Sequence, residues 1–164
     1  MNDAQRLAFE IASARDPRAE CARVTIGTQF VATVAFLRRR NEEIEASADA
    51  MARWLGFREP GIDWHRIDTK RARRVLVRVL HQDLAYDSDR MPLHEAERLA
   101  EAFLSMFQDP VVLTNGSWGM PVTQTSERVR TGPSWFPITD STFDGGIVCV
   151  GRERVGIVWV QDED

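Results

Sequence analysis

Residues 147–160 read Ile-Val-Cys-Val-Gly-Arg-Glu-Arg-Val-Gly-Ile-Val-Trp-Val, and this stretch decides the fold class of the chain. Two runs rich in β-branched residues, Ile147–Val150 and Val155–Val160, flank the four residues Gly151–Arg154. The pattern is typical of two antiparallel strands joined by a hairpin loop. Because both runs are apolar on either face, we expect other segments of the chain to cover the strands on both sides.

A third strand is predicted upstream of the hairpin. The apolar run Val111–Thr114 is followed by the turn-forming pair Asn115-Gly116, which marks the end of a strand. Residues 115–144 contain many Gly, Pro, Ser and Thr residues and predict a long irregular loop.

Before residue 109 the apolar residues follow helical spacing. The spacing predicts a first helix over Asp3–Arg15, another from Asp68 or Thr69 to about Ala85, and a third over 92–107 that Pro92 opens. Asp68 or Thr69 is the expected N-cap of the second of these helices.

Residues 18–55 carry two competing patterns. Apolar residues at even positions from Val24 to Phe36 indicate a strand, whereas apolar steps of three and four from Ile26 to Leu55 indicate a helix. The helical pattern is the longer one and contains no proline, so we predict one long helix over about 18–55. As heptads it would place Asn41 in an apolar seam, which predicts either packing inside the domain or a homodimer through helix 34–55.

Together these elements predict an α+β fold in one domain over residues 1–164. Residues 1–108 would be helical, with about four helices, one of them long. These helices would pack on a small antiparallel sheet formed by residues 109–164, which end in a β-hairpin.

Composition excludes several classes of protein. The chain has 164 residues, of which 43% are hydrophobic and 28% charged, as in soluble globular proteins. No apolar run approaches the ~18 residues of a membrane span, and the N-terminus lacks the pattern of a secretory signal. We therefore expect no membrane partner and a cytoplasmic location, with Cys21 and Cys149 reduced. The single lysine beside many arginines and alanines suggests a GC-rich bacterial genome.

The residues that could perform chemistry do not form a recognisable set. His65, His81 and His94 have no second His or Cys at zinc-ligand spacing. Residues 140–145 imitate the start of a calcium loop, but Gly151 stands where the bidentate Glu should be. We predict no catalytic residues, no cofactor and no metal.

Charge and aromatic residues instead point to contact with another protein. Residues 101–164 carry four basic and nine acidic side chains, and this acidic balance favours a basic partner. The loop 115–144 adds aromatic side chains, which dominate many interfaces. We therefore predict an interaction module of the immunity-protein or regulatory type, unless the loop folds back to cover the core. The expected contact residues are Trp118, Trp135, Phe136, Asp140 and Asp144.

Two alternatives remain open. One is an enzyme or small-ligand binder with a pocket between helix 92–107 and the sheet, where His94, Arg128, Arg130 or Asp144 would act. The other is a nucleic-acid binder that uses the basic segment Arg66–Arg78, but this segment lacks interleaved aromatic residues, so nucleic acid is not favoured. Within it, Arg71, Arg74 and Arg78 share a helical face that could contact an anion or an acidic partner.

Overall fold

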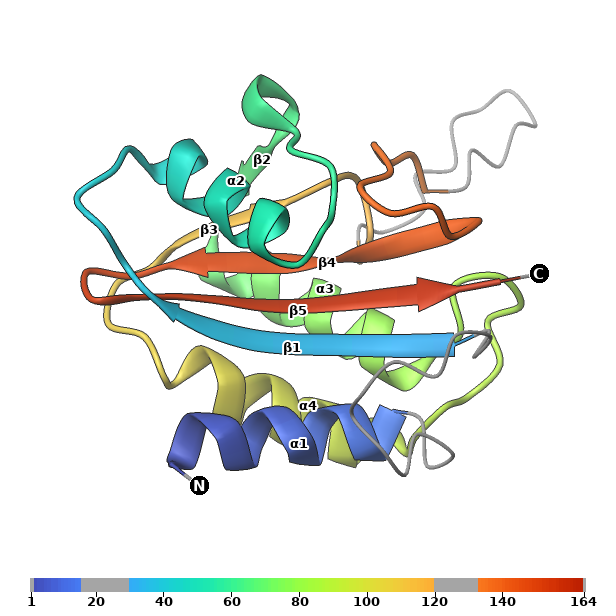
Figure 1. The fold of residues 1–164 in the computed structure, drawn as a ribbon. Helices are drawn as coiled ribbons and strands as arrows, with labels where there is room; N and C mark the ends of the chain where they lie inside the picture. Colours follow the sequence, from blue (N-terminus) through green and yellow to red (C-terminus); the bar gives the residue numbers. More distant parts are fainter. Residues whose placement is uncertain (1, 16–29, 120–132, 164) are drawn as a thin grey trace.

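A five-stranded antiparallel sheet organises the chain (Figure 1). The computed structural model describes residues 2–15, 30–119 and 133–163. The strands lie in the order β1-β5-β4-β3-β2, so the long strands β1, β5 and β4 are neighbours and the short β2 forms one edge. Their bounds are β1 Phe30–Arg38, β2 His65–Ile67, β3 Val111–Thr114, β4 Phe143–Val150 and β5 Arg154–Asp162.

The predicted hairpin is confirmed and is longer than expected. β4 and β5 pair from Phe143 opposite Asp162 to Val150 opposite Val155. The turn closes through a hydrogen bond from the backbone N–H of Gly151 to the carbonyl of Arg154, 2.9 Å. Both strands are buried on both faces, as their uniformly apolar sequence predicts.

Helices cover the two faces of the sheet unequally (Figure 1). Three of them pack on one face together with Val112, Ile147, Cys149 and Val158: α1 Asp3–Arg15, α3 Thr69–His81 and α4 Leu93–Leu104. The opposite face is covered by α2 Ile44–Trp54, which contributes Ala48 and Met51 to a second core with Trp64 and Trp159. A single 3-10 turn, Gly61–Asp63, follows α2. The α+β class and the four helices are therefore confirmed.

Three of the predicted helices appear close to their expected bounds. α1 occupies the predicted residues Asp3–Arg15. α3 begins after Asp68, whose carboxylate accepts the backbone N–H of Arg71 at 2.7 Å, but it ends at His81 instead of about Ala85. α4 starts directly after Pro92 and ends at Leu104.

The prediction of one long helix over residues 18–55 is wrong. Residues 18–29 lie outside the described residues, 30–38 form strand β1, and only 44–54 are helical, as α2. β1 pairs along its whole length with β5, for example Val34 opposite Val158. Side chains alternate between the two cores, with Val34 and Phe36 on the α1 side and Ala35 and Leu37 on the α2 side. The alternation at even positions was therefore the informative pattern, because strand pairing with β5 supplies both the hydrogen bonds and the burial.

The same finding removes the basis for a homodimer through helix 34–55. Val34 and Leu37 lie on a strand, and Asn41 lies between β1 and α2. Ala48 and Met51 are on α2 but are fully buried against the sheet of their own chain. No continuous seam exists over 34–55 for a second helix to meet.

Two strands, β1 and β2, also come from residues 1–108, which we expected to be helical.

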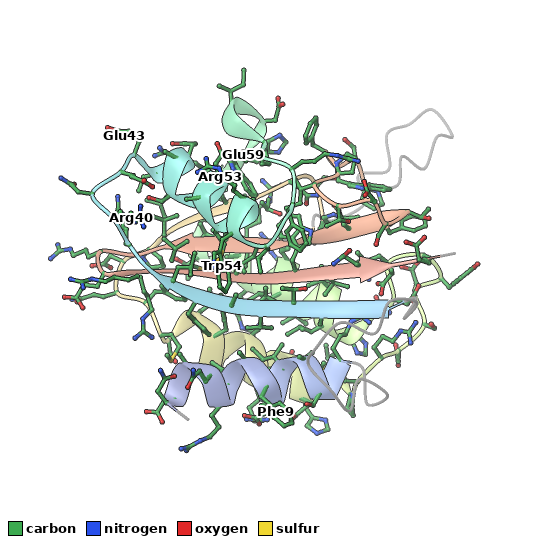
Figure 2. The ribbon with its side chains drawn as sticks, in the orientation of Figure 1. Phe9, Arg40, Glu43, Arg53, Trp54 and Glu59 are labelled. Carbon is green, nitrogen blue, oxygen red and sulfur yellow. The ribbon has the colours of Figure 1, made fainter. Side chains whose placement is uncertain are left out.

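Two further features concern the apolar surface of the molecule. No helix among the described residues is long and apolar enough to cross a lipid bilayer. Large apolar side chains are exposed at isolated positions, among them Phe9 on the outer side of α1 and Trp54 at the end of α2 (Figure 2).

Candidate functional site

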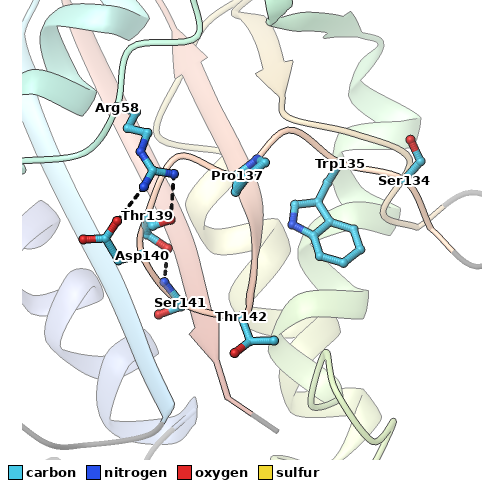
Figure 3. A pocket seen from close by; sticks show the side chains of 8 residues that line it. All are labelled: Arg58, Ser134, Trp135, Pro137, Thr139, Asp140, Ser141 and Thr142. Atoms are coloured by element: carbon cyan, nitrogen blue, oxygen red, sulfur yellow. Dashed lines mark hydrogen bonds and ion pairs between the residues drawn. The ribbon is translucent and has the colours of Figure 1, made fainter.

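The last part of the irregular loop, within residues 134–142, lines a wide-open surface cavity of about 490 Å³ (Figure 3). One wall comes from the segment that precedes β4, and the opposite wall comes from Arg58, in the connection after α2. Two of the predicted contact residues, Trp135 and Asp140, line it. The full lining is Arg58, Ser134, Trp135, Pro137, Thr139, Asp140, Ser141 and Thr142.

Asp144 fixes the backbone behind this cavity. Its Oδ2 accepts hydrogen bonds from the backbone N–H of Ile138 (2.9 Å), from the N–H of Thr139 (2.7 Å) and from the Thr139 hydroxyl (2.7 Å). The side chain is fully buried, and this burial raises the pKa of Asp144, while the hydrogen bonds from Thr139, Ile138 and Asn115 oppose the rise. Asp144 is therefore an anchor of the loop and not a surface contact residue, which corrects its predicted role.

Asn115 anchors the loop from the end of β3. Its carbonyl accepts the backbone N–H of Phe136 at 2.7 Å, and its amide donates to the Phe136 carbonyl and to the Asp144 carboxylate, both at 2.8 Å. The next residue, Gly116, lies so close to the later part of the loop that a Cβ on it would be 2.2 Å from the Ser134 carbonyl oxygen. The pair Asn115-Gly116, expected to form a turn, instead holds two backbone segments together.

The aromatic residues of the loop divide into core and surface. Trp118 is 1% exposed, and its indole N–H donates to the Asp144 carbonyl at 3.0 Å. Its ring is 4.9 Å from that of Trp135, which in turn stacks on Phe143 at 5.5 Å. The alternative that loop aromatics cover the core is thus correct for Trp118. Phe136 is different, because the residue is 43% exposed.

One ion pair spans the mouth of the cavity. Arg58 and Asp140 approach to 2.5 Å, and Arg58 also donates to the Thr139 carbonyl at 3.3 Å (Figure 3). The Asp140 side chain is 96% exposed, so the pair lies in water and not in a protected pocket. Exposed ion pairs of this kind contribute little to stability.

The acidic surface expected of residues 101–164 is smaller than the sequence suggests. Asp144 and Asp162 are fully buried, and Glu101 is paired with Arg73 at 2.6 Å. At the loop, Asp140 and Glu163 remain at the surface, where Glu163 accepts the backbone N–H of Thr142 at 3.2 Å.

The three arginines predicted to form one basic face on α3 have separate surroundings. Arg71 is half-buried and its guanidinium lies 3.5 Å from the Gly116 carbonyl oxygen. Arg78 pairs with Asp87 and reaches the carbonyls of Gln82 and Asp83. Arg74 is exposed. The structure therefore does not join them into one open anion site.

The predicted ligand pocket beside α4 is filled. Leu99, Ala100 and Phe103 are fully buried in the core that α4 shares with the sheet. His94 is exposed at the start of α4, while Asp144 is buried under the loop, and Arg128 and Arg130 lie outside the described residues. Among the residues that the structure describes, no three His, Cys, Asp or Glu side chains gather in a way that could hold a metal ion.

Sequence reasoning missed Arg58 and Asn115 as site residues. Arg58 resembles any other surface arginine in the sequence, and Asn115 carries a strong turn signal that conceals its buried bridging role. Comparisons of the chain with protein-family models, with curated proteins and with solved structures found no match.

Proposed function

We propose that the protein is a non-catalytic interaction module that binds a protein partner through the loop surface, which we define as Arg58 and the exposed and half-exposed residues among 134–142. The observation that carries the proposal is the combination of an exposed Phe136 residue with a Phe136 backbone whose two polar groups are both hydrogen-bonded. Its N–H and its carbonyl are both hydrogen-bonded to Asn115. The two residues Ile138 and Thr139 are bonded to the buried Asp144.

Such an arrangement supports binding for an energetic reason. An exposed aromatic ring on a mobile loop would lose conformational entropy on binding, whereas a ring on a pinned backbone has already lost much of it. Aromatic anchors beside a polar rim are typical of interface hot spots. Here the rim is the polar part of the cavity wall formed by Asp140, Ser141 and Thr142.

Asp140 favours a basic partner. Its nearly fully exposed carboxylate is paired with Arg58, and exposed pairs of this kind contribute little to stability. A lysine or arginine from a partner can therefore join or replace Arg58 at small cost, and the carboxylate would speed the encounter by electrostatic steering.

The wider setting that we propose is regulation in the bacterial cytoplasm. A small protein that touches a basic surface fits the type that neutralises a toxin or restrains an enzyme. We infer the bacterial origin and the regulatory role from the composition and charge of the chain, and identification of the partner would test both.

The test is selection of a random peptide display library on the immobilised protein. We expect enriched peptides to combine Arg or Lys with an apolar residue. Replacing Phe136 by Ser should weaken the selected peptides at least ~10-fold, since a hot-spot truncation costs more than about 1.4 kcal/mol. Phe9→Ser, at a comparably exposed Phe on α1, is the matched control and should leave binding unchanged.

Two further variants sharpen the result. Asp140→Asn should reduce binding at low salt more than at high salt, because its contribution is electrostatic. Asp144→Ala keeps the Phe136 and Asp140 side chains but removes the hydrogen bonds that hold Ile138 and Thr139, so it should weaken binding too. Equal binding by wild type and Phe136→Ser would overturn the proposal, as would a failure to enrich any peptide.

A small ligand in the same cavity is the second candidate function. The volume of about 490 Å³ falls within the ~300–1,000 Å³ range of ligand pockets. A metabolite that raises the Tm of the wild type but not that of Asp140→Asn would favour this candidate over a protein partner.

A further inference from the structure

A second cavity lies at the other end of the sheet, where β1 ends and the β4–β5 hairpin turns. Its volume is about 640 Å³, and its walls include four arginines and one carboxylate, that of Glu153. Two of the arginines, Arg38 and Arg39, end β1 or follow it, and the other two, Arg152 and Arg154, belong to the hairpin. This concentration of positive charge is separate from the loop surface and is not used by the proposed function.

Two of these arginines face each other across the sheet. Arg38 is directly opposite Arg154 in the pairing of β1 with β5. Residues directly opposite on antiparallel strands point to the same face, and like charges in such a pair are destabilising. A bound anion between the two guanidinium groups would turn this repulsion into attraction.

The other contacts orient the guanidinium groups without neutralising them. Arg39 donates to the carbonyls of Gly151 and Glu42, both at 3.0 Å. The Arg154 guanidinium lies 5.9 Å from the centroid of the Phe36 ring. Among the residues that the structure describes, no carboxylate forms an ion pair with any of the four arginines. Their charge is therefore available to a ligand.

The start of α1 adds a smaller contribution of the same sign. Asn2 and Ala4 line the cavity, so the first turn of the 13-residue helix α1 borders it, with the backbone N–H of Gln5 capped by the Asn2 side chain at 2.8 Å. The partial positive charge of a helix N-terminus favours anions. Asp3, in the same turn, does not line the cavity and lies 3.9 Å from Arg6.

We propose that this cavity, which we call the arginine cavity, binds a phosphorylated small molecule through its phosphate oxygens. Guanidinium groups suit this chemistry because their planar N–H forks match phosphate geometry. Several arginines around one cavity favour a diphosphate over a single phosphate.

The test measures binding of inorganic pyrophosphate by calorimetry, with inorganic phosphate as the monophosphate probe and sodium chloride at equal ionic strength as the baseline. We expect pyrophosphate to bind more tightly than phosphate and to raise the Tm, while chloride has no such effect. The double variant Arg38→Gln/Arg152→Gln should weaken pyrophosphate binding at least tenfold.

Arg40→Gln is the matched control, because Arg40 follows Arg39 directly but lies in the connection to α2 and does not line the cavity (Figure 2). It should bind pyrophosphate like the wild type. In the absence of ligand, the double variant Arg38→Gln/Arg152→Gln should have an unchanged or slightly higher Tm, because it removes the like-charge pair of Arg38 with Arg154; this result also shows that the double variant folds.

Three outcomes would overturn the inference. The first is a response to pyrophosphate no larger than that to chloride. The second is equal weakening by Arg40→Gln and by the double variant, which would indicate general charge attraction. The third is tighter binding of a 20-nucleotide single-stranded DNA than of pyrophosphate, with the same loss in all variants, which would indicate a nucleic-acid surface.

Discussion

At the scale of single residues, burial decides what each ionisable side chain can do. Asp144 and Asp162 are fully buried, although in the sequence they look like a surface acid and a terminal acid; Cys149 is fully buried too, as its place in an apolar strand predicts. The first two add nothing to the acidic surface on which the expectation of a basic partner was based. Their burial could not be predicted, because the strand pattern of 143–162 does not reveal which positions the loop and α1 cover.

Cys149 gives a prediction at this scale. It lies in the core between the sheet and the helices, and burial raises the pKa of its thiol well above the ordinary value. The unfolded chain therefore loses this proton at a lower pH than the folded protein. The free energy of unfolding should decrease, relative to Cys149→Ala, as the pH rises above about 9, by at most about 1.4 kcal/mol per pH unit.

Urea unfolding of both proteins between pH 8 and pH 10.5 measures this difference. Any constant effect of the cavity left by Cys149→Ala cancels, because only the change with pH is compared. Curves that remain parallel over this range would show that the folded thiol ionises as readily as the unfolded one.

At the scale of elements, caps and apolar periodicity predicted the secondary structure correctly where the predicted apolar face is also the face that packs in the core. α3 begins where Asp68 can cap it, and its apolar stripe Ala72, Val75, Leu76 and Val79 is fully buried. For β1 the local pattern was misleading. Its apolar residues follow helical spacing in the sequence, but the segment forms a strand. A strand can bury residues on both of its faces, so alternation over a few residues outweighs a longer helical pattern when a partner strand is present.

The cap of α3 gives the second prediction. Asp68→Ala leaves the backbone N–H of Arg71 without its side-chain acceptor, and should lower the free energy of unfolding by about 1 kcal/mol. Asp68→Ser retains a capping oxygen and should cost only a fraction of this. Thermal or urea unfolding of the three proteins measures the effect; equal losses in both variants would mean that the cap contributes nothing.

At the scale of the whole molecule, a buried ion pair joins the first helix, α1, to the last strand, β5. Arg15, the last residue of α1, lies 2.7 Å from Asp162, the last residue of β5, and both side chains are fully buried. Arg15 also donates to the Val79 carbonyl of α3 at 2.8 Å. Burial lowers the pKa of Arg15 and raises that of Asp162, while the partner's charge opposes both changes.

The third prediction concerns this pair. Arg15→Met leaves the buried Asp162 carboxylate unpaired and should destabilise the protein by about 3–5 kcal/mol. Arg15→Met/Asp162→Asn should recover some of the loss, because the Asn oxygen can still accept the backbone N–H of Leu84, now 2.8 Å from Asp162. Arg6→Met, on the exposed side of the same helix, should cost within about 0.5 kcal/mol.

Urea unfolding of the four proteins tests this coupling. A double variant that is less stable than Arg15→Met would contradict the account, since it would show that the unpaired charge was not the cause of the loss.

The sequence by itself determined the α+β class, the hairpin over 147–160, and the helices α1, α3 and α4. Each of these is encoded locally, in the period of apolar residues, in caps and in turn residues, which are read over a few positions. Only the tertiary structure decided that 30–38 is a strand, that Asp144 and Trp118 are buried, and that Arg58 faces Asp140. It also brought Arg38 opposite Arg154. These facts depend on contacts between residues far apart in the chain, and such contacts form only when β1 pairs with β5 and the loop closes over β4.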